Sequence, residues 1–132
     1  MRPERLEILI RALRARVGHG DEWILWLEGR RLPPDLEGLA ASGANPPPEV
    51  LERGTVWPRS VLTPIRCSSP TLDALAGAVS NHALPEIADH VHVTDAGGWL
   101  LSLYDVGGDD PPSMSPRLPA EFRRALEPTA PQ

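Results

Sequence analysis

Two histidines separated by a single valine, His90 and His92 in the segment DHVHVTD, are the first side chains that could act together. Alternate residues of a β-strand point to the same face, so both imidazoles would enter one space, as two ligands of a zinc ion do. A metal site needs at least a third ligand, for which Asp105 or Asp110 is a candidate. One hypothesis is therefore a small metal-dependent hydrolase that uses His90 and His92.

The pairing of two predicted strands, residues 89–95 and 99–105, decides what surrounds the histidines. A three-residue loop, Ala96-Gly97-Gly98, gives one apolar face, and Gly98 can adopt the left-handed conformation that closes such a loop. That face consists of Val91, Val93, Trp99, Leu101 and Leu103. An even-numbered loop would mix apolar and polar side chains on both faces.

The opposite face of this hairpin carries His90 near Tyr104 and His92 near Ser102, and we expect it to be exposed and polar. In this register Asp105 projects from the other face. An even-numbered loop would bring His90 and Asp105 together, so the metal hypothesis depends on that register or on Asp110 folding back.

Cys67 is a second candidate, because together with His82 and an aspartate it would form a nucleophilic cysteine site. No catalytic signature surrounds Cys67, and a cysteine at the end of an apolar strand is commonly a small buried residue. We therefore predict that Cys67 is not catalytic. A single cysteine also excludes an internal disulfide, which favours a reducing compartment, the cytoplasm.

The loop from Asp105 to Asp110, DVGGDD, follows the predicted hairpin directly and is stiffened by Pro111 and Pro112. Aspartate and glycine are what solvated turns require, so a turn alone explains the loop. The alternative is an acidic contact surface, made by Asp105, Asp109 and Asp110, that attracts a basic partner protein.

Two tryptophans would extend this contact surface. Trp26 lies on the second face of the predicted strand 22–28, and Trp57 precedes a proline in a predicted edge segment. Aromatic residues near a polar rim are typical anchors of protein interfaces, and burial is the equal alternative for both tryptophans.

Composition and charge exclude several partners. The 132 residues carry a formal net charge of −5, and all 13 basic residues are arginine, which is typical of a GC-rich bacterial genome. A sequence-independent nucleic-acid binder needs a basic surface, so we expect no nucleic-acid partner. No segment has the apolar run of a signal peptide or a membrane span, and neither glycine pair has phosphate-loop spacing. We expect no membrane association and no cofactor.

The remaining elements must position these groups. Apolar residues recur at helical spacing from Leu6 to Val17, Ser69 and Pro70 are typical of the start of a later helix, and residues 119–127 predict a final amphipathic helix. Pro58 and Pro64 confine the extended segment 55–67 to a sheet edge.

Strands and helices that do not strictly alternate predict an α+β fold. We expect one two-layer domain over residues 1–127, with an antiparallel sheet of about four strands and helices mainly on one face, and a frayed tail over 128–132. The patterns favour a non-catalytic protein-binding module, such as a small inhibitor, an immunity-type protein or an accessory subunit.

Overall fold

A five-stranded antiparallel sheet forms one layer of the domain in the computed structural model, which describes residues 4–20, 22–41, 43–44 and 61–126. The strands lie in the order β2-β1-β3-β4-β5. Their bounds are β1 Ile24–Gly29, β2 Val61–Arg66, β3 His90–Asp95, β4 Gly98–Leu103 and β5 Ser113–Met114. The predicted α+β fold and the β3-β4 hairpin are confirmed. The strand beyond the predicted four is the two-residue β5, which follows the loop and pairs with β4.

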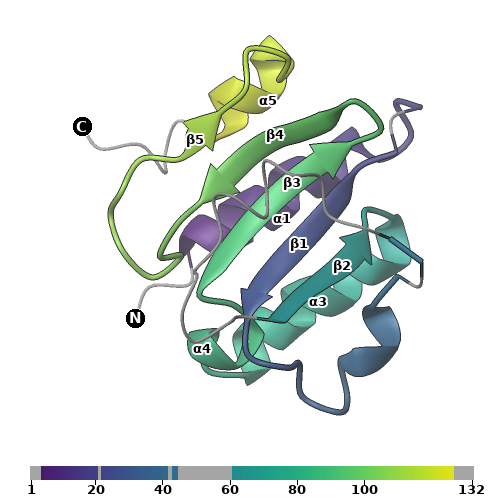
Figure 1. Cartoon of the computed structure of the whole chain (residues 1–132), viewed down its shortest axis with the longest axis vertical. Coiled ribbons are helices and arrows are strands. Elements are labelled where there is room, and N and C mark those ends of the chain that lie inside the picture. Colours follow the sequence, from purple (N-terminus) through teal and green to yellow (C-terminus); the bar gives the residue numbers. More distant parts are fainter. Residues whose placement is uncertain (1–3, 21, 42, 45–60, 127–132) are drawn as a thin grey trace.

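Helices α1 (Glu4–Arg16) and α3 (Ser69–Asn81) pack together against one face of this sheet (Figure 1). The chain also forms η1 (Glu37–Leu39), α4 (Leu84–Ile87) and α5 (Ala120–Ala125). Helix α1 has Glu4 and Glu7 in its first turn and Arg14 and Arg16 in its last, which suits the helix dipole. The N-cap of α3 is Ser68, one residue before the predicted start, because Ser68 and Thr71 form a capping box.

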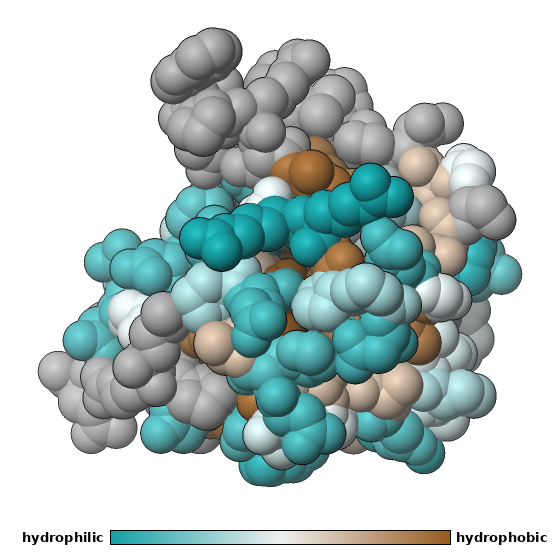
Figure 2. All heavy atoms as spheres, turned by 90° about the horizontal axis from the view of Figure 1, so that it is seen from below, coloured by the Kyte–Doolittle hydropathy of each residue, from teal (hydrophilic) through white to brown (hydrophobic). Residues whose placement is uncertain are grey.

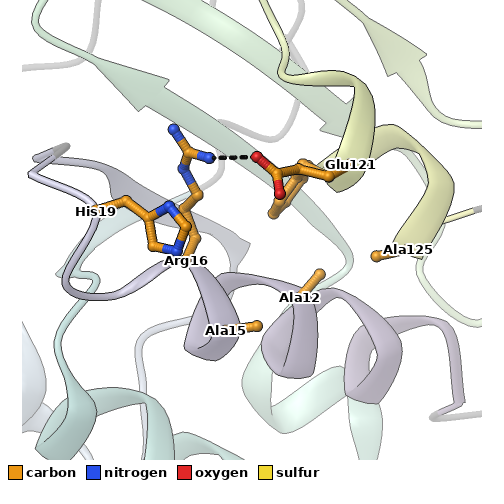
Figure 3. A pocket seen from close by; sticks show the side chains of 7 residues that line it. Ala12, Ala15, Arg16, His19, Glu121 and Ala125 are labelled. Atoms are coloured by element: carbon orange, nitrogen blue, oxygen red, sulfur yellow. Dashed lines mark hydrogen bonds and ion pairs between the residues drawn. The ribbon is translucent and has the colours of Figure 1, made fainter.

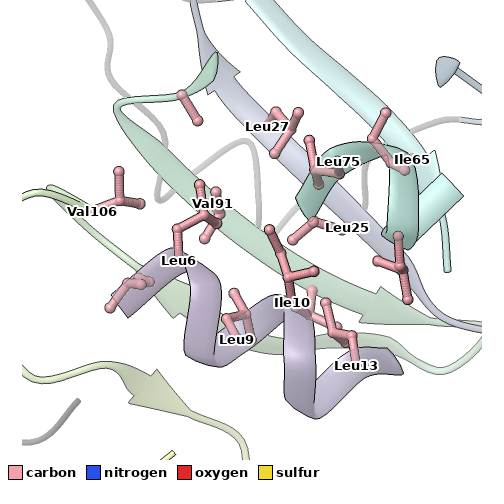
Figure 4. Packing of buried hydrophobic residues seen from close by; sticks show 14 of the residues in the cluster. Leu6, Leu9, Ile10, Leu13, Leu25, Leu27, Ile65, Leu75, Val91 and Val106 are labelled. Atoms are coloured by element: carbon pink, nitrogen blue, oxygen red, sulfur yellow. The ribbon is translucent and has the colours of Figure 1, made fainter. Parts of the chain in front are cut away.

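The core lies between these helices and the sheet (Figure 4). One stripe of α1 meets alternate residues of the strands, since a helix buries positions three to four apart and a strand buries every second residue. The core residues labelled in Figure 4 come from α1 (Leu6, Leu9, Ile10, Leu13), β1 (Leu25, Leu27), β2 (Ile65), α3 (Leu75), β3 (Val91) and the segment after β4 (Val106).

Strand β2 is an edge strand, as its proline predicts. Pro64 lies opposite Trp26 of β1, and its carbonyl oxygen accepts a hydrogen bond from the Ala41 backbone N–H at 2.8 Å on the outer side. A proline lacks a donor, so it is tolerated where no further strand follows. Pro58 lies outside the described residues, as does the tail 128–132.

The hairpin register is confirmed at Val93 opposite Leu101 and Val91 opposite Leu103, but the predicted loop is wrong. Asp95 pairs with Gly98, so the turn has two residues, Ala96 and Gly97, and the register then shifts between Val93 and Thr94. A bulge places one extra residue on β4 and reverses which face the next side chain occupies.

Trp99 is therefore not on the apolar face. Its indole Nε1–H donates to Ser102 Oγ at 2.8 Å, on the side of His92, while the neighbouring Leu100 is buried in the core cluster. The bulge stabilises both residues, because the Trp99 indole N–H gains a hydrogen-bond acceptor and the Leu100 side chain is buried in the core.

Candidate functional site

His92 lies at the centre of a buried polar network rather than on an exposed face. It is 0 % exposed, and its two ring nitrogens contact Glu28 Oε1 at 2.8 Å and Ser102 Oγ at 2.6 Å. Glu28 is 1 % exposed and Ser102 0 %. The predicted exposed polar face is wrong for His92, because β3 lies inside the sheet and both neighbouring strands supply a polar partner.

The hydrogen atoms of this network follow from its chemistry. An indole N–H can only donate, so Ser102 Oγ accepts from Trp99, and in the neutral Nε2–H tautomer of His92 the serine hydroxyl donates to Nδ1. In this tautomer Nε2–H donates to the Glu28 carboxylate. Each group satisfies the next, as burial of polar atoms requires.

A serine, a histidine and a carboxylate are also the members of a nucleophilic triad, but there the serine faces Nε2 and the carboxylate faces Nδ1, whereas here Ser102 contacts Nδ1 and Glu28 contacts Nε2. Here Ser102 is fully buried, and its oxygen already accepts from Trp99. A nucleophile must reach a substrate carbon, so the network as it stands is structural. The sequence predicts Ser102 beside His92 but not Glu28, because β1 cannot be aligned with β3 from the sequence.

The metal hypothesis for His90 and His92 finds no converging ligand set. Both nitrogens of His92 are engaged, and Nδ1 of His90 accepts from the backbone N–H of Asp105 at 2.7 Å. The Tyr104 ring packs against both imidazoles, with centroids 5.5 Å and 5.7 Å apart. Within the described part of the chain, no group of three or more His, Cys, Asp or Glu side chains is placed to hold a metal.

Cys67 and His82 do not form a nucleophilic pair. They flank opposite ends of the 13-residue α3, and such a helix is about 20 Å long. Burial raises the pKa of the Cys67 thiol to about 12, although a backbone hydrogen bond involving Leu25 lowers it in part. His82 instead contacts Asp35 at 3.0 Å. A thiol with so high a pKa is a poor nucleophile.

Arg5 holds the backbone of the acidic loop. Arg5 lies in the first turn of α1 and is 7 % exposed, and its guanidinium donates to the carbonyl oxygens of Asp105 (3.3 Å), Gly108 and Asp110. Asp105, Asp109 and Asp110 are themselves exposed. The loop therefore has its carbonyls turned inward to a cation and its acidic residues at the surface.

The sequence analysis missed Arg5. An arginine beside Leu6 on an amphipathic helix is ordinarily taken for a solvated residue, and only the return of the loop from the far end of the chain gives it acceptors. Buried arginines usually have such partners, because an unpaired guanidinium is costly to desolvate.

Trp26 is 1 % exposed, and its Nε1–H donates to Thr94 Oγ1 at 2.8 Å. A side chain buried within its own chain offers no surface to a partner, so its placement at an interface is wrong. Trp57, the second tryptophan of that hypothesis, lies outside the described residues.

A small hollow of about 140 Å³ lies between α1 and α5 (Figure 3). Its lining is largely apolar, from Ala12, Ala15, Phe122 and Ala125, with His19 at the rim. Arg16 at the rim is paired with Glu121 at 3.2 Å and stacked 5.5 Å from the Trp23 ring centroid. The Arg16 guanidinium is thus engaged by Glu121 and Trp23, and the apolar lining of the hollow offers no polar group to orient a ligand.

Apolar side chains are scarce on the surface. Figure 2 shows the end of the molecule that α4 and the η1 segment form, where hydrophilic side chains predominate and apolar residues show only between them. Among the described residues, Val61 is the exposed large hydrophobic residue, at 44 %. None of the described helices has the length and apolar run that a bilayer crossing requires.

Comparison with protein-family models, with curated proteins and with solved structures found no match to this chain.

Proposed function

We propose that this protein is a cytoplasmic, non-catalytic protein-binding module that presents the loop from Asp105 to Asp110 to a basic partner protein. The observation that carries the proposal is the anchoring of this loop by Arg5, which holds its carbonyls inward and leaves three aspartates exposed. A fixed backbone reduces the ordering cost of binding, and clustered carboxylates steer a basic surface towards it.

The chemistry elsewhere in the described residues supports a binding role over a catalytic one. The Glu28–His92–Ser102 network is buried, and the Cys67 thiol has a pKa of about 12. The biochemical class that fits is a small inhibitor, an immunity-type protein or an accessory subunit, all of which act through a surface.

A capture experiment tests the proposal. The wild-type chain is immobilised and exposed to an extract of its native cells at low salt, beside the triple variant Asp105→Asn, Asp109→Asn, Asp110→Asn. Asparagine tolerates the left-handed backbone of position 105, so the turn is preserved. A control triple variant, Glu37→Gln, Asp73→Asn, Glu86→Gln, removes the same charge from exposed sites on η1, α3 and α4.

We expect one basic protein to be retained by the wild type and by the control, to be released as salt rises, and to be lost from the loop variant. Equal retention by all three chains, or retention by none, contradicts the proposal.

A further inference from the structure

Asp105 forms the joint between β4 and the acidic loop. Among the described residues it is the one non-glycine with a positive φ, +52°. Its backbone N–H donates to Nδ1 of His90 at 2.7 Å, and its carbonyl oxygen accepts from Gly108 N–H at 2.8 Å and from Arg5 at 3.3 Å. Left-handed backbone is unfavourable for side-chain-bearing residues, so these bonds are what hold the joint.

The bond to His90 exists only for a neutral imidazole. A neutral ring has one acceptor nitrogen, whereas a protonated ring has two donors and no acceptor. Because the Asp105 N–H points at Nδ1, the ring proton of His90 is on Nε2. A second proton on Nδ1 would place two N–H groups face to face.

We propose that His90 is a pH-sensitive latch on the acidic loop: the neutral ring holds Asp105, and proton uptake releases it. Histidine is the side chain that ordinarily changes charge between about pH 5 and 8. The latch regulates the loop and rests on the proposed function for its biological role, but the bond itself can be tested without any partner.

Ionisable side chains surround His90. On β1 its cross-strand partner is Glu28, Asp89 precedes it in the chain, His92 follows two residues later on β3, and from the end of β4 it meets Tyr104 and Asp105. The hydrogen bond from Asp105 requires the neutral ring, so a proton on Nδ1 breaks that bond.

Nuclear magnetic resonance of the ¹⁵N-labelled full chain tests the latch. Long-range proton–nitrogen spectra report the tautomer of His90, and amide spectra follow Asp105 from about pH 8 to about pH 5. We expect the Nε2–H tautomer at the upper pH. As the ring takes up a proton, the Asp105 amide should shift with the same midpoint, and its protection factor should fall about five- to ten-fold.

Two variants serve as controls. In His90→Asn the side-chain oxygen replaces Nδ1 as acceptor and cannot take up a proton, so the Asp105 amide should keep its protection at every pH. In His90→Ala the protection should be low throughout. If a variant fails to fold, the wild-type titration alone decides.

An Nδ1–H tautomer at the upper pH, or an Asp105 amide that stays unmoved while the His90 ring titrates, overturns the latch. These outcomes involve no partner. A failed capture experiment would instead overturn the binding function and leave the spectra unaffected.

Discussion

His92 and His90 stand two residues apart on one strand, yet their surroundings are opposite. His92 is 0 % exposed and bonded to two side chains from neighbouring strands. His90 is half-buried at the end of the sheet, and its ring accepts from the backbone where β4 becomes a loop. Thus His92 bonds to side chains within the sheet, whereas His90 holds the backbone of a surface loop. The position of each histidine along the strand determines which partner it meets.

Among the variants that test this difference, we expect His92→Ala to lose the most stability. The substitution leaves the buried Glu28 carboxylate without its imidazole donor, and a hydrogen bond to a charged group contributes about 1.5–3 kcal/mol, to which the cavity left by the ring adds a further loss. Urea denaturation measures the free energy of unfolding. His82→Ala is the matched control, because His82 contacts a carboxylate of Asp35 that is 64 % exposed, and its loss should cost under about 1 kcal/mol. Equal losses would contradict a structural role specific to His92.

Arg5→Ala tests the loop side of the comparison. Three carbonyl oxygens lose a charged donor, and such bonds contribute about 1.5–3 kcal/mol, so we expect a loss of about 2 kcal/mol. Hydrogen exchange should accelerate at the amides of residues 105–110 before the sheet is affected. Arg11→Ala, on the exposed side of α1, should change the stability by less than about 0.5 kcal/mol. A loop that exchanges unchanged in Arg5→Ala would show that Arg5 does not hold it.

Asp95 gives a smaller, pH-dependent effect at the turn of the same hairpin. Burial raises its pKa, but the Arg117 guanidinium at 3.0 Å and the backbone N–H groups of Gly97 and Gly98 outweigh this and hold the pKa below its usual range. A lowered folded-state pKa stabilises the fold above the unfolded pKa of about 3.9, and this contribution is lost as pH falls through the folded value.

Asp95→Asn should therefore be less stable than the wild type by about 1 kcal/mol at neutral pH, with the difference shrinking below about pH 4. Urea denaturation at a series of pH values measures it. A difference that stays constant down to the acid limit would exclude the ionised pair as its source.

The smallest expected effect concerns the Arg14–Asp73 pair between α1 and α3. Its side chains are 44 % and 64 % exposed, so Asp73→Asn should cost no more than about 0.5 kcal/mol despite the 2.9 Å contact. A loss of stability as large as that of His92→Ala would mean that burial does not determine how much these pairs contribute to the free energy of unfolding. The thermal midpoint in low and high salt is sufficient to decide.

Much of the fold was predictable because it depends on local patterns. The stripe of α1, the edge position of the strand that contains Pro64 and the pairing of Val91 with Leu103 follow from periodicity and from one missing donor. The face of Trp99 was not predictable, because a bulge changes the parity of a strand without altering its composition.

The site was predictable only in part. His92 and Ser102 could be paired within one hairpin, and the structure places them 2.6 Å apart. Glu28 and Arg5 reach their partners across 64 and about 100 positions of the chain, and no local pattern specifies such contacts. The burial of His92 and Ser102 on the second face was not predictable either, because alternation within a hairpin does not show whether a face is covered.

We propose that partner binding depends on the acidic loop and not on the buried network. The most direct measurement is the association rate of the captured partner as a function of salt, for the wild type, the loop triple variant and Ser102→Ala. We predict slower association with a weaker salt dependence for the loop variant alone, and wild-type rates for folded Ser102→Ala. Unchanged association by the loop variant, with binding lost in folded Ser102→Ala, would contradict the account.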